Sequence, residues 1–217
     1  MSLTAAYAEP PDAVFEILRK GERIGFHVVE SEETADGLIV STHVRMRVKF
    51  GPIPVYGYAH QAVELWRGGA LQGLQSRTED NGTSMSLSLR SEIGRLIIDG
   101  TAWRGAAPQG AAPSSYWNRA VIGAATHINS QNGELIDVET TYAGRSVAPN
   151  GEPADRYRIR GTVVADFWYE GERWVGSSFT IDGEELVYRL VDPQSVAILA
   201  PIRSTSAAAP SLALTLP

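Results

Sequence analysis

The sequence predicts an all-β fold, a curved antiparallel sheet or partly closed β-barrel with at most one short helix. Two observations support this fold class. Apolar and polar residues alternate with a period of two over most of the chain, and turn dipeptides interrupt the alternation about every ten residues. A sheet of about ten strands cannot stay flat, so we expect it to curl around a core or a cavity.

The alternation is clearest in three segments. Residues 44–50 alternate between apolar residues and Arg or Lys, residues 84–89 alternate between Ser and Met or Leu, and residues 156–160 alternate between Arg and Tyr or Ile. Each segment is typical of a strand that has one buried face.

Six dipeptides that end in glycine mark predicted turns. Asn-Gly and Asp-Gly suit tight hairpins because both central residues must adopt a positive φ. The dipeptides are Asp36-Gly37, Asn81-Gly82, Asn132-Gly133, Asn150-Gly151, Glu170-Gly171 and Asp182-Gly183.

Helical periodicity is weak, and the best candidate for a short helix is the segment 114–125. The preceding residues 105–113 are rich in Gly, Ala and Pro, which predicts a surface loop. We expect a flexible N-terminus at 1–12, a single β-barrel-like domain at 13–203 and a disordered, low-complexity tail at 204–217.

Composition argues against several classes of function. The net charge of −6 offers no positive field to phosphate backbones, so we expect no nucleic-acid binding. No run of about 18 apolar residues occurs, which predicts that the chain does not span a membrane. Because cysteine is absent, disulfides and thiolate chemistry are excluded. The sequence contains neither a dinucleotide-binding fingerprint nor a phosphate loop, so we expect no cofactor.

The N-terminus carries a possible export signal. Ala6-Tyr7-Ala8, followed by Glu9-Pro10, is similar to a small-residue signal cleavage site, although no apolar segment precedes it. One interpretation is a remnant of the cleavage region, which predicts a periplasmic or secreted protein. The other is a floppy, alanine-rich terminus.

A series of short motifs extends over most of the chain, roughly from residue 14 to residue 190. The motifs are Gly21-Glu22-Arg23-Ile24-Gly25, Tyr58-Ala59-His60, Glu64-Leu65-Trp66, Thr78-Glu79-Asp80-Asn81-Gly82, Tyr116-Trp117-Asn118, Gly133-Glu134-Leu135, Arg156-Tyr157, Trp168-Tyr169, Trp174-Val175-Gly176, and Asp182-Gly183 before Tyr188. In this order they resemble the DUF6134 family of uncharacterised bacterial proteins. The resemblance implies an exported β protein, related in shape to lipoprotein carriers or lipocalin-like barrels. It implies no established activity, so no catalytic residue follows from it.

Three histidines fall on successive predicted strands. His27, His43 and His60 would suit zinc if their rings converged. A two-residue loop at Asp36-Gly37, however, pairs His27 with Met46 on the apolar face and leaves His43 on the other face. We therefore predict no metal site, unless a bulge or a loop of odd length reunites the rings.

The next hairpin brings aromatic and basic residues together. A four-residue loop at 51–54 pairs Tyr58 with Arg47 and His60 with Arg45, so that all four share one face. The favoured interpretation is a solvated outer face whose basic residues discourage edge association.

The second interpretation is that this face lines a cavity. Tyr58, His60 and Glu64 would then orient a polar head group. His60 and Glu64 are about 13 Å apart along the strand, so they cannot touch directly.

Five tryptophans form a third set of candidates, since indoles make broad walls for hydrophobic ligands. Packing across the Glu170-Gly171 hairpin explains Trp168 and Trp174 without a ligand. The motif Tyr116-Trp117-Asn118 follows a loop, where side chains more often meet ligands, and is a candidate for the lining of an opening. The five are Trp66, Trp103, Trp117, Trp168 and Trp174.

Binding or carriage of a lipid or other hydrophobic small molecule in the cell envelope is the first functional hypothesis, because small barrels hold ligands in their mouths. An enzyme that acts on a hydrophobic substrate, with His60 or Glu64 as acid–base groups, is the second, and a structural envelope protein with a filled barrel is the third. The sequence does not predict the oligomeric state. The candidate ligand-binding residues are Tyr58, His60, Glu64, Trp66, Arg77, Trp117 and Asn118.

Overall fold

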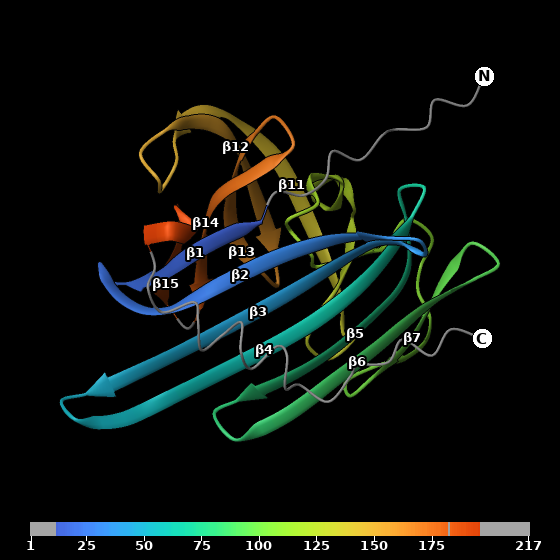
Figure 1. Cartoon of the computed structure of the whole chain (residues 1–217), viewed down its shortest axis with the longest axis horizontal. Coiled ribbons are helices and arrows are strands. Elements are labelled where there is room, and N and C mark those ends of the chain that lie inside the picture. Colours follow the sequence, from blue (N-terminus) through green and yellow to red (C-terminus); the bar gives the residue numbers. More distant parts are fainter. Residues whose placement is uncertain (1–11, 182, 196–217) are drawn as a thin grey trace.

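The computed structural model describes residues 12–181 and 183–195. The predictions for the signal-like segment and the tail at 204–217 lie outside these residues. Within them, one strongly curved sheet accounts for nearly all regular structure, which confirms the predicted fold class (Figure 1). No helix of the described chain has the length and apolar character needed to cross a bilayer.

The strands are as follows: β1 (Ala13–Arg19), β2 (Glu22–Thr34), β3 (Gly37–Phe50), β4 (Ile53–Arg67), β5 (Ala70–Asp80), β6 (Thr83–Glu92), β7 (Arg95–Gly100), β8 (Arg104–Ala106), β9 (Ala112–Pro113), β10 (Thr126–Ile128), β11 (Leu135–Val147), β12 (Pro153–Gly161), β13 (Val164–Glu170), β14 (Arg173–Ile181) and β15 (Glu184–Val191). Two short 3₁₀ helices, η1 (Arg119–Gly123) and η2 (Pro193–Ser195), complete the described elements. The first of them lies inside the segment 114–125, where the sequence predicts a short helix.

The first and last strands lie side by side in the middle of the sheet. The strand order is β8-β7-β6-β5-β4-β3-β2-β1-β15-β14-β13-β12-β11-β10-β9, so two meanders are joined along β1 and β15. All neighbours are antiparallel except β9 and β10. The ends of the order are β8 and β9, which follow one another in sequence but do not pair.

The two ends of the sheet nevertheless come close together. The backbone N–H of Ala102 donates to the carbonyl oxygen of Asn132 over 2.9 Å. A Cβ at Gly100 would lie only 2.2 Å from that same oxygen, so this approach requires glycine. The sheet is therefore a partly closed barrel. The segment 105–113 also differs from a plain surface loop, because Ala107 and Pro113 are buried.

The main core joins both halves of the chain. The inward side chains of the first meander pack against those of the second, as the period-two alternation requires. The cluster includes Phe15, Val29, Val40, Trp66 and Leu74 from the first half, and Ile159, Phe167, Tyr169 and Trp174 from the second.

The turns follow the predicted dipeptides with small shifts. Asn81 and Gly82 form a two-residue turn with φ of 47° and 90°, as predicted. At the preceding Asp-Gly site the closing pair is Thr34 and Gly37, so the loop begins one residue earlier than predicted. His27 therefore pairs with Val44 rather than Met46. The shift is two residues in register, so His27 and His43 still lie on opposite faces, as expected.

The predicted register of the β3–β4 hairpin is wrong. Phe50 pairs with Ile53 across a two-residue loop, and β4 then carries a bulge at Val55. Beyond the bulge, Tyr58 pairs with Met46 and His60 with Val44. Because one extra residue reverses every later side chain, the even-numbered residues of β4 face inward, away from Arg45 and Arg47.

Candidate functional site

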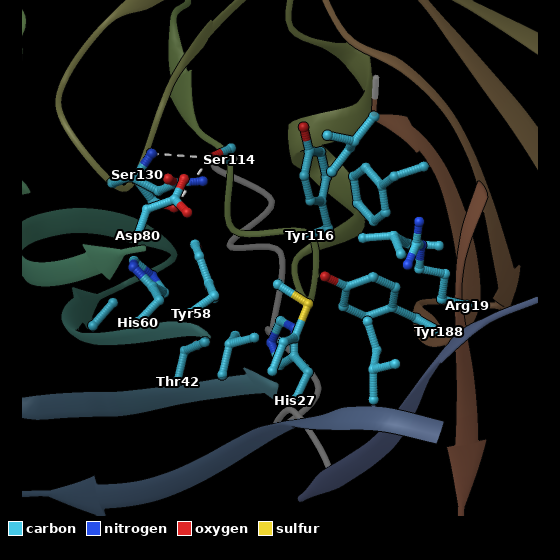
Figure 2. Close-up of a pocket in the computed structure, with 18 of the residues that line it drawn as sticks. Arg19, His27, Thr42, Tyr58, His60, Asp80, Ser114, Tyr116, Ser130 and Tyr188 are labelled. Carbon is cyan, nitrogen blue, oxygen red and sulfur yellow. Dashed lines mark hydrogen bonds between the residues drawn. The ribbon is translucent and has the colours of Figure 1, made fainter. Parts of the chain in front are cut away.

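The curve of the sheet encloses a cavity of about 600 Å³ (Figure 2). Both halves of the protein and the segment that connects them contribute to its wall, so the site exists only in the assembled fold. Apolar side chains from β3, β14 and β15 form much of the surface, among them Val44, Met46, Val48, Phe179 and Leu186.

Tyr58, His60 and Glu64 line this cavity from β4. The bulge at Val55 places them there, on the same side as Val44 and Met46. The favoured interpretation of this group as a solvated outer face is therefore wrong, and the arrangement matches the alternative in which the three residues line a cavity.

Two neutral imidazoles face the hollow. His60 Nδ1 lies 2.8 Å from Thr78 Oγ1, and burial lowers the pKa of His60 to about 4. His27 packs edge-on against Trp174 and Tyr188, and burial lowers its pKa to about 3. Burial disfavours the charged form of both rings, and no ion pair with a carboxylate offsets it in the described part of the chain, so both rings are uncharged near neutral pH.

Glu64 is the most buried carboxyl group in the cavity wall, with 1% of its surface exposed. Its Oε2 accepts a hydrogen bond from Trp66 Nε1 at 2.7 Å and its Oε1 accepts one from the hydroxyl of Ser115. Trp117 Nε1 approaches both oxygens, at 3.3 and 3.4 Å. Burial raises the pKa of Glu64 and outweighs these hydrogen bonds, which act in the opposite direction. The carboxyl group of Glu64 is therefore a buried hydrogen-bond acceptor that links neighbouring parts of the wall, rather than an exposed base.

Four tyrosines line the cavity, namely Tyr56, Tyr58, Tyr116 and Tyr188. Tyr116 Oη lies 3.2 Å from His127 Nδ1 and so has a partner. Within the described chain, neither Tyr58 nor Tyr188 has a hydrogen-bond partner for its hydroxyl, and burial raises the pKa of both. These two phenols remain un-ionised and available to a ligand (Figure 2).

The mouth of the cavity lies where exposed side chains join its lining, at Val55 and Ile181. Arg19 is the one cation among the described lining residues. Its Nη2 lies 3.5 Å from Glu184 Oε1, and Lys20 Nζ lies 2.9 Å from the same oxygen. The positive charge at the mouth is thus already paired.

The remaining predicted site residues have other positions. Trp117 lines the cavity and packs edge-to-face against Trp66, which lies behind the wall. Asn118 caps η1 by accepting a hydrogen bond from Ala120 N at 3.0 Å. Arg77 is exposed on the outer face of β5. Trp66, Arg77 and Asn118 therefore do not line the cavity.

The two tryptophans of the β13–β14 hairpin also separate. Trp168 joins a small cluster with Val175, whereas Trp174 lines the cavity and packs against Phe15. Trp174 pairs with Tyr169, the neighbour of Trp168 on β13, and successive side chains of a strand point to opposite faces. Trp174 packs across the hairpin against Phe167 and also against β1, so core packing accounts for both indoles, and Trp174 forms part of the cavity wall as well.

Sequence reasoning missed several cavity residues. Tyr116 belongs to the motif that predicted an opening, but His27, Ser115 and Tyr188 were not among the predicted ligand-binding residues. Among the described residues, no three His, Cys, Asp or Glu side chains come together in a way that could hold a metal ion.

Comparison with known proteins identifies relatives without an assigned activity. The model of the DUF6134 family, a domain of unknown function, matches residues 15–191. No curated protein matches the sequence. Among solved structures, the chain is similar to a beta-barrel-like protein of the domain of unknown function DUF1849 from Brucella abortus. The TM-score is 0.58 with 9% identity, over 83% of this chain and 95% of that chain, which shows a shared fold alone.

Proposed function

This chain belongs to the DUF6134 family, and we propose that it binds or carries a lipid or other hydrophobic small molecule in the cell envelope. The observation that carries the proposal is the cavity of about 600 Å³. Small-molecule sites are mostly apolar hollows of about 300–1,000 Å³ that contain a few placed polar groups. Burial of an apolar ligand against Met46, Leu186 and Phe179 would remove both surfaces from water, which stabilises the complex.

The polar groups of the cavity wall favour a ligand whose polar head group is uncharged. The hydroxyls of Tyr58 and Tyr188 can donate hydrogen bonds, and the ring of His60 presents a second nitrogen beside the one near Thr78. A carboxylate or phosphate at that depth would meet no unpaired cation of the described lining, and burial of an unpaired charge is costly. Ester, ketone or hydroxyl oxygens are the groups that fit.

The alternatives have less support. A structural barrel filled by its own side chains would leave little room for a ligand, whereas this one is hollow. For an enzyme, His60 and Glu64 would have to act on one substrate. Yet Glu64 is occupied by donors from Trp66 and Ser115 and does not contact His60.

The cavity does not bear on the proposed location in the cell envelope, which is inferred from the sequence. That inference rests on the small-residue motif Ala6-Tyr7-Ala8, which is similar to a signal cleavage site. Fractionation of the native host, with sequencing of the mature N-terminus, tests this part separately. An uncut chain in the cytoplasm would contradict it.

Native mass spectrometry of gently purified protein, followed by solvent extraction, tests the binding proposal. We expect an uncharged lipid in stoichiometric amount with the wild type. Val44→Trp, which fills the cavity, should remove it, and His43→Trp, on the opposite face of the same strand, should retain it. Equal lipid in both variants, or an empty wild type that also fails to take up added uncharged lipid, would contradict the proposal.

A further inference from the structure

The β3–β4 hairpin projects beyond its neighbours at one end of the sheet (Figure 1). The exposed lining residue Val55 places the cavity mouth at this end. β2 pairs with β3 only as far as Met46, and β5 pairs with β4 only as far as Tyr58. Between these two residues, the hairpin has no described strand on either side. It is a two-stranded ribbon that ends in the turn Gly51-Pro52.

The tip of this ribbon is apolar and exposed. Phe50 is 80% exposed, Ile53 61% and Val55 54%. Single exposed apolar side chains are normal on protein surfaces, but three on one projecting turn form a patch, and such patches mark interaction sites.

Three cations line the outer face of β3 next to the tip. Arg45, Arg47 and Lys49 are all exposed. Within the described chain none of them has an ion-pair partner, whereas most other arginines do, such as Arg23 with Glu16 and Arg104 with Asp99. Three unpaired cations on one ribbon are a local positive surface in a protein whose net charge is −6.

We propose that this hairpin docks on the surface of an anionic lipid bilayer. Phe50 and Ile53 would enter the boundary between head groups and acyl chains, and the cations of β3 would contact the anionic head groups. The combination of an apolar tip with adjacent unpaired cations matches a charged bilayer, which offers an apolar layer next to anionic head groups.

The position of the hairpin relates the proposed membrane contact to the cavity. Val48, Val55 and Tyr56 line the cavity, and they belong to the same ribbon as the docking tip. Docking would hold the mouth against the bilayer, so a hydrophobic molecule could pass between membrane and cavity without crossing water. The contact with the membrane does not depend on the cavity, so it goes beyond the function proposed above.

Vesicle flotation of the full chain tests the proposal. We expect the wild type to float with vesicles of equal phosphatidylglycerol and phosphatidylcholine, and to bind pure phosphatidylcholine far less. The double variant Phe50→Ser/Ile53→Ser should lower the bound fraction roughly tenfold. The triple variant Arg45→Gln/Arg47→Gln/Lys49→Gln should do the same, as should about 1 M NaCl, where the Debye length falls to about 3 Å.

A matched control removes two exposed apolar residues elsewhere. Ile93→Ser/Val147→Ser should float like the wild type. Wild-type protein that stays in solution at low salt would overturn the proposal, as would equal loss in the control. A concentration-dependent dimer abolished by Phe50→Ser/Ile53→Ser would also overturn it and assign the tip to a second copy. Lipid content by native mass spectrometry separates the two proposals, because an empty protein that floats contradicts only the carrier function.

Discussion

The hydroxyl of Ser115 donates to Oε1 of Glu64, and this bond fastens the segment between the two halves of the chain to the inner face of β4. The indoles of Trp66 and Trp117 donate to the same carboxyl group. In a fully closed barrel, the two strands at the ends of the sheet order are joined by backbone hydrogen bonds. Here the end strands β8 and β9 do not pair with each other, and a buried side chain makes part of the connection.

Glu64→Gln is expected to remove a pH dependence of stability. Burial raises the pKa of Glu64 above its ordinary value of 4.5, so in the folded state it keeps a proton that the unfolded state has already released. The free energy of unfolding contributed by this group therefore falls as pH rises from about 4.5 through the folded pKa, by at most about 1.4 kcal/mol per pH unit. Urea denaturation from pH 5 to pH 8 measures the difference in stability between wild type and variant, which should shrink with rising pH until the folded pKa is passed. A constant difference would contradict the assignment of a raised pKa.

His27→Phe is expected to make the protein more resistant to acid. Burial lowers the pKa of His27 from 6.5 to about 3, so below pH 6.5 the unfolded state takes up a proton that the folded state does not. The associated stability is present above pH 6.5 and is lost as the pH falls, by about 2 kcal/mol between pH 7 and pH 5. Phenylalanine keeps an aromatic ring against Trp174 and Tyr188 but cannot titrate. Denaturation at the two pH values should show a smaller loss in the variant, and an unchanged loss would contradict the prediction.

Tyr58→Phe and Tyr188→Phe are expected to weaken the binding of an oxygen-bearing lipid about three- to tenfold each, the worth of one hydrogen bond. Affinity for a pure hydrocarbon probe should not change, because the rings remain. Fluorescence titration with both ligands measures the split. Tyr142→Phe is the matched control, since its hydroxyl bonds to Asp155 on the exposed surface. Equal losses for both ligands would mean that the hydroxyls do not contact the head group.

Gly100→Ala is expected to destabilise the closure of the sheet by about 2–4 kcal/mol. The added Cβ would lie 2.2 Å from the carbonyl oxygen of Asn132 and force the two ends of the sheet apart. Gly57→Ala is the control, because its Cβ would meet nothing within 4 Å. Urea denaturation of both variants provides the comparison, and equal stability of the two would show that the contact is not maintained in solution.

The fold class was predictable because alternation and turn dipeptides are local signals. Asn81-Gly82 forms the turn that its residue types require. Register is not local in the same way. The bulge at Val55 has no marker in the sequence, yet that one residue moves Tyr58 and His60 from the outer face to the cavity.

The candidate site was only partly predictable for a related reason. Residues on one strand keep their relation to each other, so Tyr58, His60 and Glu64 enter the cavity together. Tyr188 comes from the far end of the chain, and only the pairing of β1 with β15 places it opposite them. A single sequence contains no signal for a pairing of this range.

That same pairing sets the order in which the chain can fold. Val14 on β1 pairs with Val191 on β15, so the central seam joins two segments near opposite ends of the described chain. The hairpins β1 to β7 consist of sequence neighbours and can form early, even during synthesis, whereas the seam must wait for β15 and for the closure of a very long loop. Until β15 pairs with it, β1 is an exposed strand edge. We therefore expect the chain to be most prone to aggregation before the seam forms.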